Sequence, residues 1–161
     1  MIKVINSIEV ECSKDDLYNA CANVENWPNI FPSVLTVHCT SINQDELIMA
    51  MTVHNRLGIN TIESKRRYDR NAGIINFELR KLPVGIESMH GVWIVASSKH
   101  CATLKIIHNY EPENENVGIA TDIADNIHRN TEDVLRKLKD WLELRRFQKS
   151  NFGKSQSQAT I

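Results

Sequence analysis

The sequence predicts an α+β domain in which a curved, seven-stranded antiparallel sheet wraps around one long C-terminal helix, with two short helices between the first two strands. Three observations predict this fold: a run of strand-like segments joined by short turns, one amphipathic stretch after them, and a proline-interrupted segment near the N-terminus. A chain of 161 residues has the usual size of one domain and can bury a core without metal ions or disulfides.

Local patterns predict the first strand and the two short helices. Residues 2–12 alternate in the way that is typical of a strand with one face in water. Ser13, with Asp15 two residues later, is a helix-capping pattern. Pro28 and Pro32 restrict the next helical segment to a short piece, because proline breaks the backbone hydrogen-bond pattern of a helix.

Six further strands and the long helix account for most of the chain. Short loops between consecutive strands imply antiparallel pairing. Residues 117–148 are amphipathic and predict the helix, and we expect residues 1–149 to form the domain and residues 150–161 a disordered tail. One helix cannot fill the concave side of a sheet of this size, so an internal cavity is expected. The six strands are predicted at residues 34–41, 45–54, 59–69, 74–81, 86–96 and 101–111.

Composition argues against several classes of protein. The net charge of −1 does not favour nucleic acid or an anionic membrane as a partner. The four cysteines are scattered without a CxxC pair, and the six histidines show no metal-ligand spacing. The sequence contains no signal peptide or membrane-spanning segment, so we expect a cytoplasmic protein with no metal or cofactor. A basic cluster at Lys137, Lys139, Arg145 and Arg146 is expected to be a solvated helix face.

Four stretches of the sequence resemble a known superfamily. They are Asn6-Ser7-Ile8, Val24 to Phe31 (VENWPNIF), Glu63-Ser64-Lys65-Arg66, and the helix from Asn126 to Lys137. With this order of elements, the chain resembles the helix-grip superfamily (START / Bet v 1-like, SRPBCC), and within it the single-domain polyketide aromatase/cyclases. The Trp-Pro-x-x-Phe segment is common across the superfamily and supports the fold, whereas the Ser-x-Arg strand is more specific to the aromatase/cyclases.

The resemblance implies an enzyme of aromatic polyketide biosynthesis, in an antibiotic or pigment pathway. Such an enzyme binds a poly-β-ketone tethered to the phosphopantetheine of an acyl carrier protein, next to a ketosynthase complex. It promotes a regiospecific aldol cyclisation and dehydration in an internal pocket, without a cofactor. Arg66 matches the central catalytic arginine of the family. Matching substrate-binding positions are Trp27, Phe31, Ser64, Arg80, Met89, Trp93 and Asn130.

Strand alternation gives Arg66 a chemical role. Ser64 and Arg66 share one face of their strand, and the opposite face is mostly charged, so these two side chains are expected to point into the cavity. A fixed guanidinium there would stabilise the enolate that forms during an aldol condensation. The structural alternative is an ion pair between Arg66 and a carboxylate such as Asp122.

Three further residues are candidates for contact with the substrate. Asn126 and Asn130 interrupt the apolar face of the long helix, where a ligand, water or the sheet would satisfy their amides. His108 has inward parity and is a candidate acid or base that titrates near neutral pH. Arg80 is either a second residue that holds the substrate or a residue at the rim of the pocket that suits the carrier protein. The alternative is that Arg80 is a solvated charge.

The sequence also departs from the aromatase/cyclase pattern. Val34 replaces a tyrosine, and Ile62 and Asn60 occupy positions near Ser64 where the family has tryptophans. The implied hydroxyl proton donor is therefore missing. The alternative function is a non-catalytic protein of the same fold that binds or transports a lipid, polyketide or quinone.

Overall fold

The predicted strands and helices form in the order that the sequence indicates. The computed structural model describes residues 1–55 and 58–159. The strands are β1 (Ile2–Val10), β2 (Val34–Ser41), β3 (Glu46–Asn55), β4 (Gly58–Asp69), β5 (Ile74–Lys81), β6 (Ile86–Ser97) and β7 (Ala102–Pro112). The helices are α1 (Lys14–Ala22), the 3₁₀ turn η1 (Val24–Asn26), α2 (Trp27–Ile30) and α3 (Val117–Ala159).

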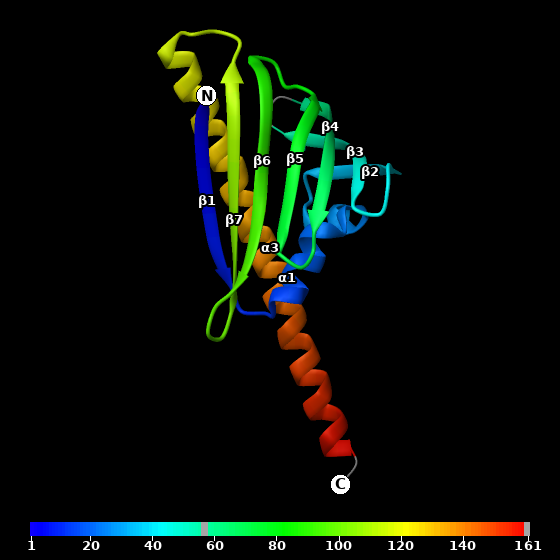
Figure 1. The fold of residues 1–161 in the computed structure, drawn as a ribbon. Helices are drawn as coiled ribbons and strands as arrows, with labels where there is room; N and C mark the ends of the chain where they lie inside the picture. The colour runs from blue at the N-terminus through cyan, green and yellow to red at the C-terminus, as the bar shows by residue number, and fades with distance from the viewer. Residues whose placement is uncertain (56–57, 160–161) are drawn as a thin grey trace.

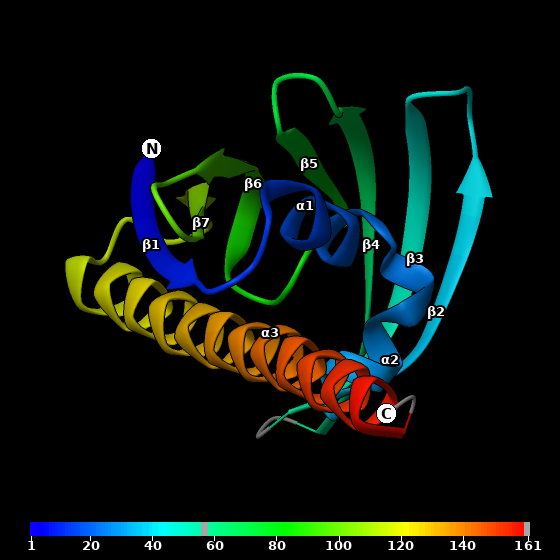
Figure 2. The same ribbon diagram turned by 90° about the horizontal axis from the view of Figure 1, so that it is seen from below.

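The seven strands form one antiparallel sheet in the order β1-β7-β6-β5-β4-β3-β2. Consecutive strands from β2 to β7 are neighbours, and β1 pairs with β7 because the two short helices carry the chain across to the other edge. The sheet curves strongly from β1 to β2, and α3 crosses beneath it, with α1 and α2 on the same side (Figure 2). This arrangement confirms the predicted fold class.

The two short helices are held by the interactions that their sequences predict. The Ser13 hydroxyl accepts a hydrogen bond from the Asp16 amide at 3.1 Å, which caps α1. Pro28 occupies the first turn of α2, where its missing N–H is not needed. The Trp27 indole N–H donates to the Ala20 carbonyl at 3.2 Å and joins α2 to α1. This last hydrogen bond fixes the Trp27 ring above the concave face of the sheet.

Helix α3 is fastened to the β1 edge of the sheet. The Asn6 amide donates to His128 Nδ1 at 2.8 Å, and the Lys139 ammonium donates to the Glu9 carbonyl at 2.8 Å. The Tyr110 hydroxyl donates to the Ala120 carbonyl at 2.6 Å near the start of the helix. These contacts hold the helix along one side of the concave face.

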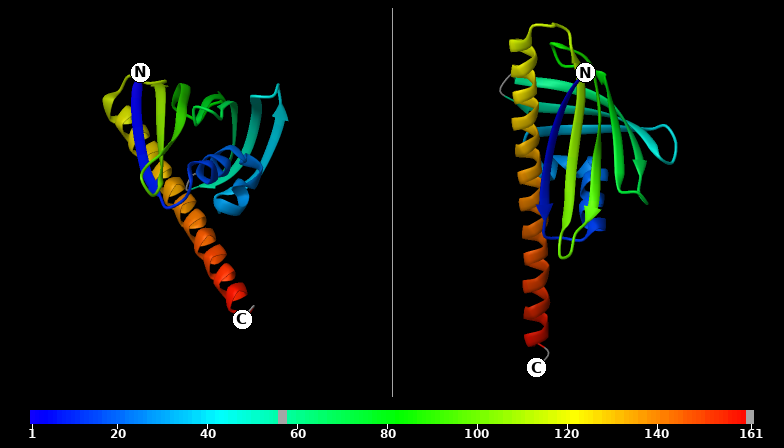
Figure 3. Two further views of the ribbon diagram at one scale, coloured as in Figure 1. Left: turned by 60° about the horizontal axis from the view of Figure 1, so that its bottom comes forward. Right: turned by 60° about the vertical axis from the view of Figure 1, so that its left-hand side comes forward.

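The long helix extends further than the sequence predicts. It continues to Ala159, so residues 150–159, which were expected to belong to a disordered tail, are helical in the structure; residues 160–161 lie outside the described residues. No proline follows Pro112, and the polar residues of this segment are compatible with a helix. Figures 1 and 3 show this last part of α3 projecting away from the sheet.

Candidate active site

Arg66 and Ser64 lie on the concave face of β4, as strand alternation predicts. Their side chains are 3% and 2% exposed, whereas Lys65 and Arg67 on the outer face are exposed. A buried arginine in the middle of a sheet is uncommon, because removing a charge from water is costly. Its surroundings therefore decide whether it has a structural or a chemical role.

Aromatic rings surround the Arg66 guanidinium. Its Cζ atom lies 4.9 Å from the centre of the Trp27 ring and 5.2 Å from that of Trp93. The two tryptophans stack with their centroids 5.6 Å apart, and Phe31 packs edge-on against Trp27 at 5.7 Å. Cation–π attraction to these faces holds the guanidinium in one place without neutralising it.

Arg66 has no ion-pair partner among the described residues. No carboxylate there lies within salt-bridge distance of it, and Asp122, the partner that the structural alternative named, is exposed. Its Nε and Nη2 atoms are buried and have no hydrogen-bond partner in this part of the chain. The structural ion pair is therefore not formed, and two guanidinium nitrogens have no partner among the described residues.

The electrostatics around Arg66 leave it as an isolated cation. Burial lowers its pKa, which the neighbouring Tyr68 hydroxyl opposes, and an arginine keeps its proton at neutral pH. Tyr68 Oη does not reach regular hydrogen-bond geometry and is itself buried without a partner. Burial raises the pKa of the nearby Cys21 thiol to about 12, so this thiol is neutral at pH 7 and does not pair with Arg66. Tyr68 was missed from sequence, although it shares the strand parity of Ser64 and Arg66.

A second polar group lies in the same cross-strand row as Arg66. Arg66 pairs with Phe77 on β5, Phe77 with Gly91 on β6, and Gly91 with His108 on β7. Three strand spacings separate Arg66 from His108, which is about 14 Å along the sheet. The Phe77 ring lies between them and packs edge-on against the imidazole of His108 at 5.3 Å.

His108 does not have the protonation behaviour that the sequence suggested. Burial lowers its pKa to about 4, so the imidazole is neutral at pH 7 and does not titrate near neutrality. The reason is desolvation on the concave face. Its Nδ1 atom is buried and, among the described residues, has no hydrogen-bond partner. His108 can therefore donate or accept a hydrogen bond, but it does not carry a charge near pH 7.

Apolar residues make up the rest of the concave face. Trp27, Phe31, Met89 and Trp93 are buried there. Val34 is also buried, so a side chain without a hydroxyl occupies this position. Several further apolar residues pack against the core and are only partly buried. They are Leu47, Met51, Ile62 and Leu79 from the sheet, and Ile123 and Ile127 from α3.

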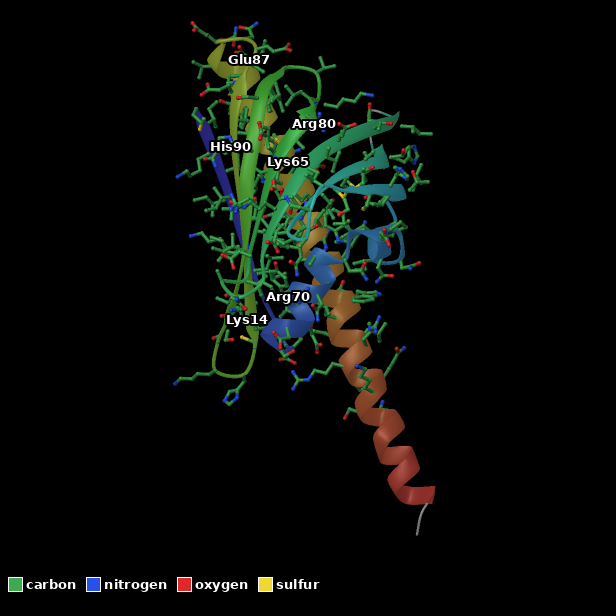
Figure 4. The ribbon with its side chains drawn as sticks, turned by 45° about the vertical axis from the view of Figure 1, so that its right-hand side comes forward. Lys14, Lys65, Arg70, Arg80, Glu87 and His90 are labelled. Atoms are coloured by element: carbon green, nitrogen blue, oxygen red, sulfur yellow. The ribbon has the colours of Figure 1, made fainter. Side chains whose placement is uncertain are left out.

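Three predicted substrate-binding residues lie elsewhere. Arg80 is half exposed on the outer face, where its Nε lies 3.7 Å from Glu63 Oε1, because alternation along β5 turns it away from the concave face. Figure 4 shows it at the far end of the sheet from Arg70. Asn126 and Asn130 are exposed, so water satisfies their amides, whereas Thr131 of α3 is buried. These placements correct the assignment of Arg80, Asn126 and Asn130 to the pocket.

Some kinds of site are not found within the described residues. No group of three histidine, cysteine, aspartate or glutamate side chains there is arranged to hold a metal ion. No helix in the described ranges is both long and apolar enough to cross a membrane.

Comparison with known proteins identifies the fold. No protein-family model and no curated protein sequence matches the chain. The structure superposes on the di-domain ARO/CYC protein BexL of the BE-7585A biosynthetic pathway with a TM-score of 0.79 and 26% identity, over 89% of this chain and 47% of BexL. It also superposes on the Zhui aromatase/cyclase from Streptomyces sp. R1128 with a TM-score of 0.77 and 19% identity, over 89% and 94% of the two chains.

The same fold occurs outside the aromatase/cyclases. A START superfamily protein from Mycobacterium smegmatis superposes with a TM-score of 0.71 and 13% identity, over 88% of this chain and 97% of that protein. The chain spans about half the length of the di-domain proteins that it matches. It therefore has the helix-grip fold that polyketide aromatase/cyclases share with START superfamily proteins.

Proposed function

We propose that this protein is an aromatic polyketide aromatase/cyclase. It binds a carrier-tethered poly-β-ketone against the concave face of the sheet and promotes aldol cyclisation and dehydration to an aromatic ring. The observation that carries the proposal is Arg66, a buried cation with two unpartnered nitrogens and no carboxylate partner among the described residues. The likeness to aromatase/cyclase structures supports the proposal.

Arg66 acts on the oxygen atoms that gain negative charge. In an aldol condensation, an enolate carbon attacks a ketone carbon, one C–C bond forms, and the ketone oxygen becomes an alkoxide that takes up a proton. Loss of that hydroxyl with a neighbouring proton then releases water. The Arg66 guanidinium donates hydrogen bonds to the enolate and alkoxide oxygens in a site with little water, where such bonds are strongest.

The other residues position the substrate. Trp27, Trp93 and Phe31 form a rigid wall beside the guanidinium and hold the chain bent, which lowers the entropic cost of joining two of its carbons. His108 is neutral and offers a hydrogen bond to a second carbonyl on the same row of the sheet. With valine at position 34, we assign the second polar contact to His108.

Reconstitution with a minimal aromatic polyketide synthase tests this function. Wild-type protein should redirect the products from shunt pyrones to an aromatised ring. Arg66→Ala should lower the yield of that ring by about 100-fold or more, the usual loss when an oxyanion donor is removed. The control Arg67→Ala removes an arginine from the outer face of the same strand and should leave the products unchanged.

The same assay separates catalysis from simple ligand binding. A non-catalytic carrier of the same fold would bind the polyketide and leave the product spectrum unaltered. Native mass spectrometry of Arg66→Ala should show that the polyketide still binds while the aromatised product is lost. An unchanged product spectrum with Arg66→Ala would show that Arg66 is not the catalytic residue.

A further inference from the structure

The inner face of α3 changes from apolar to basic where the helix leaves the sheet. Leu138 and Leu142 are buried, and the next positions on that face, three, four and seven residues after Leu142, are Arg145, Arg146 and Lys149. Figures 1 and 3 show this part of α3 running past α1 and out of the domain. The basic residues therefore lie on the side of the helix that faces α1, and not at random around it.

These three residues line a groove of about 290 Å³ between α1 and α3. The Arg145 guanidinium lies 4.3 Å from the centre of the Trp141 ring, which orients it. None of the three cations forms a salt bridge with a described residue. One carboxylate, that of Asp16, also lines the groove, so three cations face one anion.

The opposite wall of the groove supplies neutral hydrogen-bonding groups. The side chains of Asn19, Asn23 and Asn26 come from α1, the residue after it and η1. Carboxamide N–H groups beside unpaired cations suit an anionic oxygen, as in a phosphodiester. A concave site of this size accommodates a small anionic group and does not match the flat surface of a bilayer.

A chain of contacts through Trp27 connects the groove to the proposed catalytic residue. Ala20 lines it, and the Ala20 carbonyl accepts the hydrogen bond of the Trp27 indole. The Trp27 ring also contacts the Arg66 guanidinium, whose Cζ lies 4.9 Å from the ring centre. The Ala20 carbonyl and the Trp27 ring are therefore the two groups that link the groove to Arg66.

We infer that this groove docks the acyl carrier protein, with Arg145, Arg146 and Lys149 binding its acidic surface and the phosphodiester of its phosphopantetheine arm. The inference rests on the proposed function, because it takes the substrate to be tethered to a carrier. It also replaces Arg80, which pairs with Glu63 on the outer face, as the site of carrier contact. The solvated-face interpretation of Arg145 and Arg146 predicts no such binding.

Fluorescence anisotropy with a labelled holo acyl carrier protein of an aromatic polyketide synthase tests the docking site. The double variant Arg145→Glu and Arg146→Glu should raise the Kd about tenfold or more, and added salt should weaken wild-type binding. The control Arg129→Glu and Lys137→Glu makes the same change in charge on exposed positions of α3 and should stay within twofold of wild type. Circular dichroism checks that each variant is folded.

The outcomes separate this inference from the proposed function. Three results would refute the docking site, even if cyclisation still depended on Arg66. Both double variants could weaken carrier binding equally, neither could weaken it, or the wild-type protein could fail to bind the carrier. Carrier binding that is lost only in the groove variant, with no aromatised product from wild type, would support the docking site and refute the proposed function. In the reconstituted reaction, the groove variant should raise KM for the carrier substrate about tenfold with kcat little changed.

Discussion

Replacing Arg66 with methionine tests whether the arginine is kept for chemistry at the expense of stability. Arg66 is 3% exposed, and its Nε and Nη2 atoms lack partners among the described residues. Each unsatisfied buried polar group costs roughly 1–3 kcal/mol. The two tryptophan contacts return roughly 0.5–2 kcal/mol each. Methionine has a similar length, carries no charge and keeps most of the packing, so we expect Arg66→Met to raise the free energy of unfolding by about 1–3 kcal/mol.

Urea denaturation at pH 7 measures this difference, with Arg67→Met as the matched control on the outer face. The control should change the free energy of unfolding by no more than about 0.5 kcal/mol, as is usual for exposed positions. For a chain of this size, the gain for Arg66→Met corresponds to a rise in Tm of about 2–4 °C per kcal/mol. A loss of more than about 1 kcal/mol would mean that Arg66 is a structural residue and would refute the reasoning above.

Two further predictions concern the row of residues between Arg66 and His108. Gly91→Ala should lower the free energy of unfolding by about 3 kcal/mol in urea denaturation. The reason is that the added Cβ would lie 2.0 Å from the Ile107 carbonyl oxygen and 2.6 Å from the Phe77 ring. A loss below about 1 kcal/mol would contradict this packing. Burial lowers the pKa of His108 to about 4 from an ordinary 6.5. As the pH falls, the unfolded chain therefore binds a proton at this histidine before the folded chain does. The stability that comes from the neutral imidazole is lost between about pH 6.5 and pH 4. The free energy of unfolding should therefore be about 2 kcal/mol lower at pH 5 than at pH 7.5. His108→Leu should abolish this difference, whereas replacing the exposed His90 with glutamine should leave it in place.

The sequence predicts the fold well because local signals determine it. Alternation, turn residues and the Ser13 cap specify each element, and short loops leave antiparallel neighbours as the natural pairing. The inward position of Arg66 follows from the same alternation. Alternation along β5 also places Arg80 on the outer face, and the assignment of Arg80 to the pocket failed because it followed the family resemblance and not the strand pattern.

Other features of the site depend on contacts that the sequence does not reveal. The rotation of α3 about its axis is set by contacts with β1, including that of Asn6 with His128, and this rotation leaves Asn126 and Asn130 in water. The low pKa of His108 depends on desolvation by residues that are distant in sequence. The absence of a described carboxylate beside Arg66 is likewise a property of the assembled sheet.

The two polar groups in one row of the concave face, Arg66 and His108, differ in charge. Burial pushes the pKa values of arginine and histidine in the same direction, yet from different starting points, so Arg66 stays a cation while His108 becomes neutral. The row therefore offers one fixed positive charge and one neutral hydrogen-bonding group, about 14 Å apart along the sheet. Phe77, which requires glycine at position 91, keeps the space between them apolar. A chain with carbonyls at regular intervals can contact both groups at once beside the tryptophan wall, and such fixing of its conformation favours an intramolecular condensation.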